Sequence, residues 1–105
     1  MRVRLCGLFD LPLFGGRLFM DVAGTDYDVI IFKLPGGRLR AWDAHCPHAG
    51  ALLQPMNEMG GDLVCYLHTW VFDIDTGDCK TVPECPLTGY EVAVEGMDVF
   101  VTLPD

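Results

Sequence analysis

Residues 46–53, CPHAGALL, place Cys46 and His48 two positions apart at the start of a stretch with no regular pattern. The irregular stretch runs to about residue 62 and separates two segments that read as β-strands. Loops of this length without structure of their own are uncommon in compact domains unless function or a cross-link organises them. The sequence therefore predicts that a specific interaction holds this loop.

A second cysteine and histidine follow the loop. Residues 65–68, CYLH, lie at the far end of a short predicted strand, residues 62–68. The whole pattern is C-x-H, sixteen residues, C-x-x-H, in a chain with five cysteines and three histidines. Thiolates and imidazoles are ligands of both zinc and iron. The candidate metal ligands are Cys46, His48, Cys65 and His68.

This ligand set is compatible with two kinds of metal centre. One is a zinc site with two thiolates and two imidazoles, although zinc sites usually take both cysteines from one loop and both histidines from another. Here each loop contributes one of each, which suits a [2Fe-2S] cluster in which two histidines replace two cysteines on one iron. The spacing favours the iron–sulfur cluster, with both cysteines on one iron and both histidines on the other.

Alternation of apolar and polar residues predicts antiparallel strands on both sides of the loop. The alternation is clearest in residues 2–5, 90–95 and 99–103. Glycine-containing turns are predicted at residues 34–38, 75–78 and 95–98. No segment keeps a helical period, although residues 51–61 have room for a turn of helix. The predicted fold class is all-β, an antiparallel sandwich or small barrel with one long insertion.

The length and net charge of the chain exclude several classes of protein. A chain of 105 residues supports one core, so residues 1–105 are expected to form a single domain. Its formal net charge of -8 repels phosphate backbones and anionic lipid headgroups, so neither nucleic acid nor a membrane surface is an expected partner. No apolar run approaches the roughly 18 residues of a membrane-spanning helix.

The cysteine count and the first residues indicate a cytoplasmic protein. Arg2 and Arg4 resemble the charged start of a secretion signal, but Asp10 and Pro12 interrupt any hydrophobic segment after them. Five cysteines are an odd number, and without a secretion signal the thiols are expected to stay reduced.

The remaining histidine, two aromatic residues and three remaining cysteines are interpreted as structural residues. His45 is adjacent to Cys46, and adjacent side chains diverge in extended backbone, so His45 is interpreted as a bystander of the metal. Trp70 and Phe72 alternate within a predicted strand and are expected in the core. Free cysteines commonly behave as small buried hydrophobes. That interpretation is applied to the three cysteines without a histidine at matching spacing: Cys6, Cys79 and Cys85.

The last two thirds of the chain resemble the Rieske family. CPHAGALL and CYLHTWVFDIDTG, residues 46–53 and 65–77, are similar to the two Rieske cluster-binding boxes. VPECPLTGYEVAVEGMDVFV, residues 82–101, is similar to the following proline loop and closing strands. The resemblance implies the Rieske fold, an antiparallel β base with a smaller cluster-binding lobe at about 44–88. It also implies a [2Fe-2S] cluster at the tip, bound by Cys46, His48, Cys65 and His68.

A narrower resemblance concerns function. Trp70 together with CPLTGYEVAVEG, residues 85–96, is similar to the stand-alone ferredoxins of bacterial multicomponent di-iron monooxygenases that act on toluene or small alkenes. This implies a monomeric one-electron carrier, not an enzyme. Its partners would be an NADH-dependent flavin and iron–sulfur reductase and the terminal hydroxylase, docking transiently at the tip formed by His48 and His68. Two alternatives stay open: the ferredoxin of a ring-hydroxylating dioxygenase and a zinc-stabilised binding module.

The chain also departs from its relatives. The extra cysteines of respiratory Rieske proteins correspond to Ala51 and Leu67, and a serine that donates to a bridging sulfide corresponds to Trp70. Fewer hydrogen bonds to sulfur place the expected potential near the low end of the roughly -150 to +300 mV Rieske range. Thr69 stands where many relatives have glycine, which leaves the turn at this position open.

Overall fold

The computed structural model describes residues 1–47, 50–67 and 69–104 and is built almost entirely from β-strands. The strands are β1 (Arg2–Gly7), β2 (Gly15–Phe19), β3 (Val29–Lys33), β4 (Leu39–Asp43), β5 (Glu58–Met59), β6 (Asp62–Val64), β7 (Val71–Asp73), β8 (Gly89–Glu95) and β9 (Asp98–Thr102). The 3-10 helices are η1 (Leu8–Asp10), η2 (Val22–Gly24), η3 (Pro35–Gly37) and η4 (Pro55–Asn57). The predicted all-β class is confirmed. No helix among the described residues has both the length and the apolar character needed to cross a membrane.

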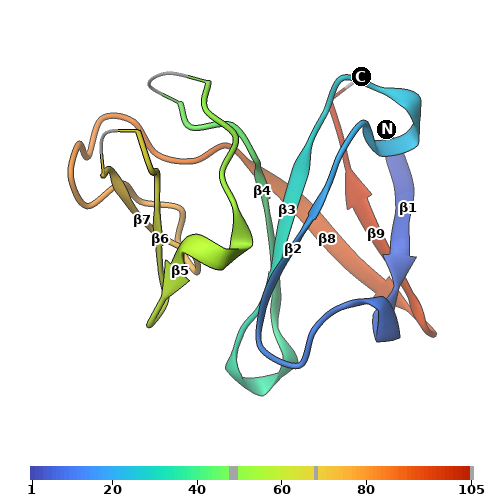
Figure 1. Ribbon diagram of the computed structural model, residues 1–105. Coiled ribbons are helices and arrows are strands. Elements are labelled where there is room, and N and C mark those ends of the chain that lie inside the picture. Colours follow the sequence, from blue (N-terminus) through green and yellow to red (C-terminus); the bar gives the residue numbers. More distant parts are fainter. Residues whose placement is uncertain (48–49, 68, 105) are drawn as a thin grey trace.

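The larger sheet is antiparallel and has the strand order β1-β9-β8-β4-β3-β2. It curls into an open half-barrel, with β1 and β9 on one side and β2 and β3 on the other (Figure 1). Strands β4 and β8 pair only through Ala41 with Tyr90 and Trp42 with Gly89. This short pairing joins the two halves of the half-barrel. We call this larger sheet the base.

A second sheet, in the order β5-β6-β7, is formed by residues that lie between β4 and β8 in the sequence. Figure 1 shows it beside the base as a separate lobe. The predicted strand at residues 62–68 is shorter than expected, because β6 ends at Val64. The chain turns directly after this strand, beginning at Cys65, whose carbonyl accepts from Thr69 N–H at 2.9 Å.

Strand β3 is covered on both faces. Alternate side chains of a strand point to opposite sides, and Ile30 and Phe32 belong to the core shared with the lobe, whereas Val29 and Ile31 belong to the core inside the base. All four side chains are buried. A strand buried on both faces reads as a continuous apolar run rather than an alternating one, which explains the sequence VIIF.

The predicted turns, and the turn of helix predicted within residues 51–61, are present. Residues 34–38 turn through η3, where Gly36 and Gly37 have φ values of 83° and 78°. The irregular stretch from 46 to 62 contains η4 and β5, and an isolated bridge joins His45 to Leu52. Local structure therefore organises part of this loop.

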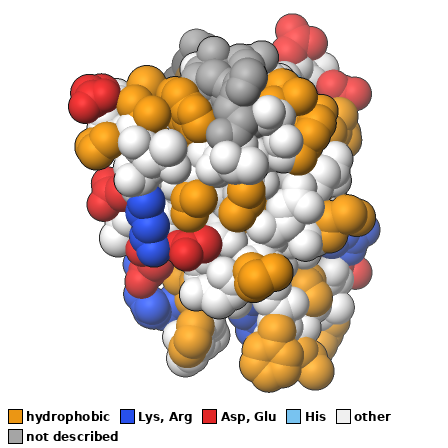
Figure 2. Space-filling view, turned by 60° about the vertical axis from the view of Figure 1, so that its left-hand side comes forward, with side chains coloured by type: hydrophobic (Ala, Val, Ile, Leu, Met, Phe, Trp, Pro, Cys, Tyr) orange, Lys and Arg blue, Asp and Glu red, His pale blue; other side chains and the backbone are white. Residues whose placement is uncertain are grey.

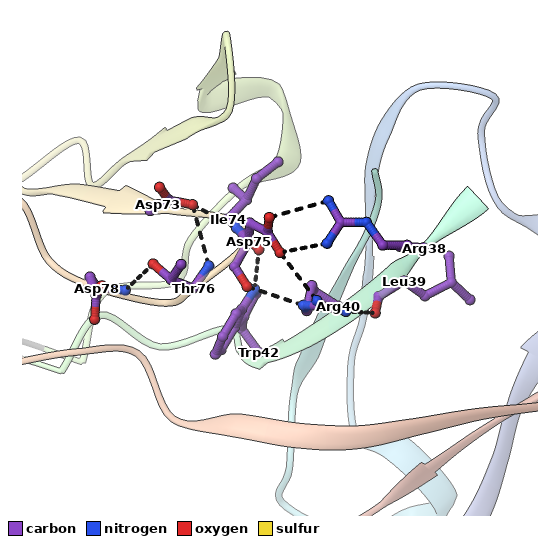
Figure 3. A network of polar contacts seen from close by, with 9 residues as sticks. All are labelled: Arg38, Leu39, Arg40, Trp42, Asp73, Ile74, Asp75, Thr76 and Asp78. Atoms are coloured by element: carbon purple, nitrogen blue, oxygen red, sulfur yellow. Dashed lines mark hydrogen bonds and ion pairs between the residues drawn. The ribbon is translucent and has the colours of Figure 1, made fainter. Parts of the chain in front are cut away.

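The lobe is fixed to the base through the turn that follows β7 (Figure 3). Trp42 of β4 donates its Nε1–H to the carbonyl of Ile74 at 2.8 Å. Arg38 forms two hydrogen bonds to the carboxylate of Asp75, and Arg40 donates Nε–H to the carbonyl of the same residue at 3.1 Å. One buried indole and two guanidinium groups of the base thus hold a single turn of the lobe.

Two glycines make room for the Trp42 ring. A Cβ atom added at Gly77 would lie 2.5 Å from the ring, and one added at Gly89 would lie 2.8 Å from it. Gly77 also has a φ of 81°, which favours glycine. The ring fits between the lobe turn and β8 only because neither residue has a side chain.

Candidate metal centre

The first cysteine loop begins directly after the base strand β4. Cys46 is buried, with 1% of its surface exposed. Its N–H donates to the carbonyl of Ala51 at 2.8 Å, and its own carbonyl accepts from Gly50 N–H at 2.8 Å. These two hydrogen bonds join Cys46 to Gly50 and Ala51.

The second cysteine loop closes in the same way. Cys65 follows β6 and is 1% exposed. Its N–H donates to Trp70 O at 2.8 Å, and its carbonyl accepts from Thr69 N–H at 2.9 Å. In both loops the cysteine is therefore joined to the fourth and fifth residues after it. Two separate segments of the chain present a buried thiol in the same backbone setting.

The fourth residue after each cysteine, Gly50 or Thr69, has a left-handed backbone. Gly50 has a φ of 68° and Thr69 a φ of 54°. A positive φ at this point turns the chain back so that the next carbonyl can meet the cysteine N–H. Glycine adopts this conformation without steric cost, whereas a residue with a Cβ is strained there. Thr69 thus keeps the turn that glycine forms in the first loop.

The structure describes two of the four predicted ligands. Cys46 and Cys65 belong to one buried core cluster, together with Leu53, Leu63 and Phe72. His48 and His68, the two predicted imidazole ligands, lie outside the described residues. The described donor set fits an iron–sulfur cofactor, because both thiols are soft ligands shielded from water in matched loops.

His45 was interpreted from the sequence as a bystander of the metal, but the structure gives its ring two specific partners. Nε2 lies 2.8 Å from Oδ2 of Asp28, and Nδ1 lies 3.2 Å from the carbonyl oxygen of Gly50. Burial lowers the pKa of His45, but the hydrogen bonds to Gly50 and Asp28 and the nearby carboxylate charges outweigh it, so the pKa is raised. Spacing gave no signal for this contact, because Asp28 precedes β3 and His45 follows β4.

The three remaining cysteines differ in their surroundings. Cys6 is buried in the core of the base, and burial raises the pKa of its thiol. Cys79 is buried in the same core cluster as Cys46 and Cys65, and its Sγ accepts from Val82 N–H at 3.2 Å. The interpretation as small buried hydrophobes is confirmed for these two, whereas Cys85 is only half-buried.

Exposed apolar side chains lie beside the second cysteine loop. Met56 and Met59 are 85% and 81% exposed, and Tyr66, which directly follows Cys65, is 62% exposed. Together with Asn57 and Val64 they line a hollow of about 330 Å³. We call Met56, Met59 and Tyr66 the methionine face. Hydrophobic side chains are spread over the lobe side of the molecule in Figure 2.

Comparison with known proteins gives consistent matches. The family model of the Rieske [2Fe-2S] domain matches residues 3–94. The 3-phenylpropionate/cinnamic acid dioxygenase ferredoxin subunit of Shigella boydii serotype 4 (strain Sb227) is 32% identical over 106 residues, which cover 99% of this chain and 95% of that protein. The subunit of the same name from Escherichia coli (strain K12) gives the same identity and coverage.

Comparison with solved structures gives matches of the same kind. The ferredoxin of carbazole 1,9a-dioxygenase from Nocardioides aromaticivorans IC177 has a TM-score of 0.70 and 28% identity, covering 96% of both chains. A chain of the reduced complex between oxygenase and ferredoxin in carbazole 1,9a-dioxygenase has a TM-score of 0.80 at 18% identity. The match covers only 28% of that chain and shows a likeness of fold.

The all-β fold, the cysteine loops and these matches together define the class: the chain belongs to the Rieske [2Fe-2S] domain family. It is a Rieske ferredoxin, an electron carrier rather than an enzyme, and its cofactor is a Rieske-type [2Fe-2S] cluster. The predicted fold and cofactor are confirmed, and the zinc-stabilised binding module is wrong. The predicted link to a di-iron monooxygenase is not confirmed by these relatives.

Proposed function

We propose that the chain is the ferredoxin of a ring-hydroxylating dioxygenase system. It would take electrons one at a time from an NADH-dependent flavin and iron–sulfur reductase and pass them to the terminal oxygenase. The observation that carries this proposal is the 32% identity, over nearly the whole chain, to a dioxygenase ferredoxin subunit. This favours the alternative stated from the sequence over the di-iron monooxygenase. The resemblance of Trp70 and residues 85–96 to monooxygenase ferredoxins keeps the di-iron hydroxylase as the second candidate acceptor.

We also propose that Cys46 and Cys65 bind one iron and that His48 and His68 bind the other. The matched hydrogen bonds around the two buried thiols support this assignment. When bound, the cluster accepts one electron and gives it up again. The chain keeps water from the thiolates and holds both loops in fixed backbone conformations. Neutral imidazoles place less negative charge on their iron than thiolates, so that iron is where the added electron is expected.

The proposed organisation is a single Rieske domain, residues 1–105, with a cluster-binding lobe at about 44–88. The sheet β5-β6-β7 and both cysteines fall inside this range, between the base strands β4 and β8. We further propose a cytoplasmic monomer that docks transiently with reductase and oxygenase at the tip carrying His48 and His68. The neighbouring exposed side chains of Tyr66 and Leu67 would supply apolar contacts for that docking.

The acceptor is tested by mixing the reduced protein, in a stopped-flow instrument, with two purified acceptors. One is the terminal oxygenase of a ring-hydroxylating dioxygenase, and the other is the hydroxylase of a di-iron monooxygenase. We expect rapid, saturable reoxidation by the dioxygenase component and slow reoxidation by the hydroxylase. The reverse order of rates would assign the chain to the second candidate.

The ligand assignment is tested with matched thiol variants. Cys46→Ala and Cys65→Ala should abolish the visible absorption and the iron content of the folded protein. Cys6→Ala removes a buried thiol from the core of the base and should keep two irons per chain. A Cys65→Ala protein that retains the wild-type spectrum would refute the assignment.

A further inference from the structure

The ring of His45 connects the base to the first cysteine loop. It follows β4 and stands directly before Cys46, with Nε2 2.8 Å from the carboxylate of Asp28 and Nδ1 3.2 Å from the carbonyl of Gly50. The two contacts lie at opposite ends of one rigid five-membered ring. A planar ring held at both ends fixes the distance between its two partners.

Asp28 is a fixed partner on the base side. The residue is only 7% exposed, and its other carboxylate oxygen accepts from Asp21 N–H at 2.8 Å. Its carbonyl accepts from Ala44 N–H at 2.9 Å, next to the end of β4. The carboxylate is thus oriented by the backbone on one side and meets the imidazole on the other. Leaving a buried carboxylate oxygen without its partner is costly.

Gly50 is the matching partner on the loop side. It is the residue of positive φ whose N–H donates to Cys46 O, and its carbonyl begins the peptide that leads to Ala51. Ala51 in turn accepts the N–H of Cys46. A contact that orients the carbonyl of Gly50 therefore orients the peptide between the two hydrogen bonds that close the loop.

The two cysteine loops differ in the backbone pairing of the segments that lead into and out of them. Strands β6 and β7 pair at three successive positions, up to Val64 with Val71, directly beneath the second loop. The first loop has an isolated bridge between His45 and Leu52 and a hydrogen bond from Leu53 N–H to Ala44 O. A strand ladder supports the second loop, whereas the first loop has the His45 ring in addition to a single bridge.

We propose that His45 is a positioning residue, which holds the first cysteine loop in its cluster-binding conformation by joining Gly50 to Asp28. It does not act as a metal ligand. Its effect is to slow the release of the cluster and to keep one geometry around the cluster. This inference rests on the proposed role of Cys46 as a ligand, so its test reads a property other than the presence of the cluster.

The test uses the holo-protein and three substitutions at one position. Asparagine places an amide nitrogen near the position of Nδ1, and glutamine places one near the position of Nε2. His45→Ala provides neither nitrogen, His45→Asn keeps the contact with Gly50, and His45→Gln keeps the contact with Asp28. The rate of cluster loss is measured from the decay of visible absorption in the presence of an iron chelator. The EPR spectrum of the reduced protein reports the geometry around the cluster.

We expect His45→Ala to lose its cluster at least fivefold faster than wild type and to show a broadened or shifted EPR spectrum. His45→Asn and His45→Gln should each recover part of the difference. Asp28→Asn should also accelerate the loss, and the double variant Asp28→Asn with His45→Ala should lose the cluster no faster than His45→Ala alone, because both changes break one connection.

Lys80→Ala is the matched control. It removes a 2.6 Å contact with Asp62 on the same lobe, but this contact is exposed and does not involve a cysteine loop. Its cluster-loss rate and EPR spectrum should equal those of wild type. Wild-type rates and spectra in His45→Ala, or additive effects in the double variant, would overturn the proposal. If His45→Ala is purified without a cluster, equally empty His45→Asn and His45→Gln proteins would overturn it, and partial occupancy in either would support it. Cluster retention in Cys46→Ala would instead overturn the ligand assignment.

Discussion

At the residue scale, the fourth residue after each cysteine shows that two different residue types adopt the same backbone conformation. Gly50 and Thr69 have φ values of 68° and 54°. A left-handed conformation costs a residue with a Cβ about 1–2 kcal/mol, and the indication of it in the sequence is that Thr69 stands where many relatives have glycine. The hydrogen bonds of the loop impose the conformation in spite of it.

We therefore predict that Thr69→Gly is more stable than Thr69→Ala. Both substitutions remove the same hydroxyl and methyl groups and differ only in the Cβ atom, so their difference in free energy of unfolding reports backbone strain. We expect about 1 kcal/mol in favour of glycine, measured by urea unfolding. The mirror substitution Gly50→Ala, whose Cβ would meet nothing within 4 Å, should cost a similar amount. An alanine variant at Thr69 as stable as the glycine variant would refute the strain.

Tyr90 gives a prediction about pH. Burial, with the charge and hydrogen bond of Asp43, raises the pKa of its phenol from 10.0 to about 12. The fold therefore favours the neutral phenol. Its contribution to stability is complete below pH 10 and is lost as the pH rises towards 12. The difference in phenolate absorption between wild type and Tyr90→Phe should have its midpoint near pH 12. A midpoint near pH 10 would contradict the burial of this ring.

At the scale of elements, the sequence predicted best what depends on neighbouring residues. Alternation identified β1, β8 and β9, and glycine identified the turns, because these features repeat within a few positions. The ligand spacing likewise singled out Cys46 and Cys65. Contacts between distant elements carried no such signal. The ring of His45 reaches Asp28, and Trp42 reaches Ile74, only because the sheet places those segments together.

The packing of Trp42 gives a prediction for β8. Gly89→Ala would place a Cβ 2.8 Å from the Trp42 ring, and the ring is held by its hydrogen bond to Ile74, so we expect a loss of about 1–3 kcal/mol. Gly7→Ala, at the end of β1, is the control, because its nearest atom is the terminal carboxylate oxygen of Asp10 at 3.2 Å rather than a packed ring. Urea unfolding should show Gly7→Ala near wild type. Equal costs for both variants would mean that the ring moves freely.

At the scale of the whole molecule, most cations are already neutralised. The formal net charge is -8, with seven lysines and arginines against fifteen acidic residues. The ion pairs between these groups in the described part of the chain include Arg2 with Glu95, Arg4 with Asp98, Arg38 and Arg40 with Asp75, and Lys80 with Asp62. The field that a partner meets is therefore strongly negative, while the methionine face beside the second cysteine loop offers apolar contact.

These two surfaces predict different responses to salt. If the negative field guides the ferredoxin to a basic patch on the oxygenase, the second-order rate of electron delivery should fall several-fold between low and moderate salt, because the screening length at physiological ionic strength is only about 8 Å. Stopped-flow oxidation of the reduced protein measures this rate, and a small neutral oxidant, whose rate should barely change, is the control. A rate that stays flat or rises with salt would mean that apolar contact drives docking. In that case Met56→Ser and Met59→Ser should slow delivery to the oxygenase without slowing the neutral oxidant, and the acidic surface would serve solubility alone.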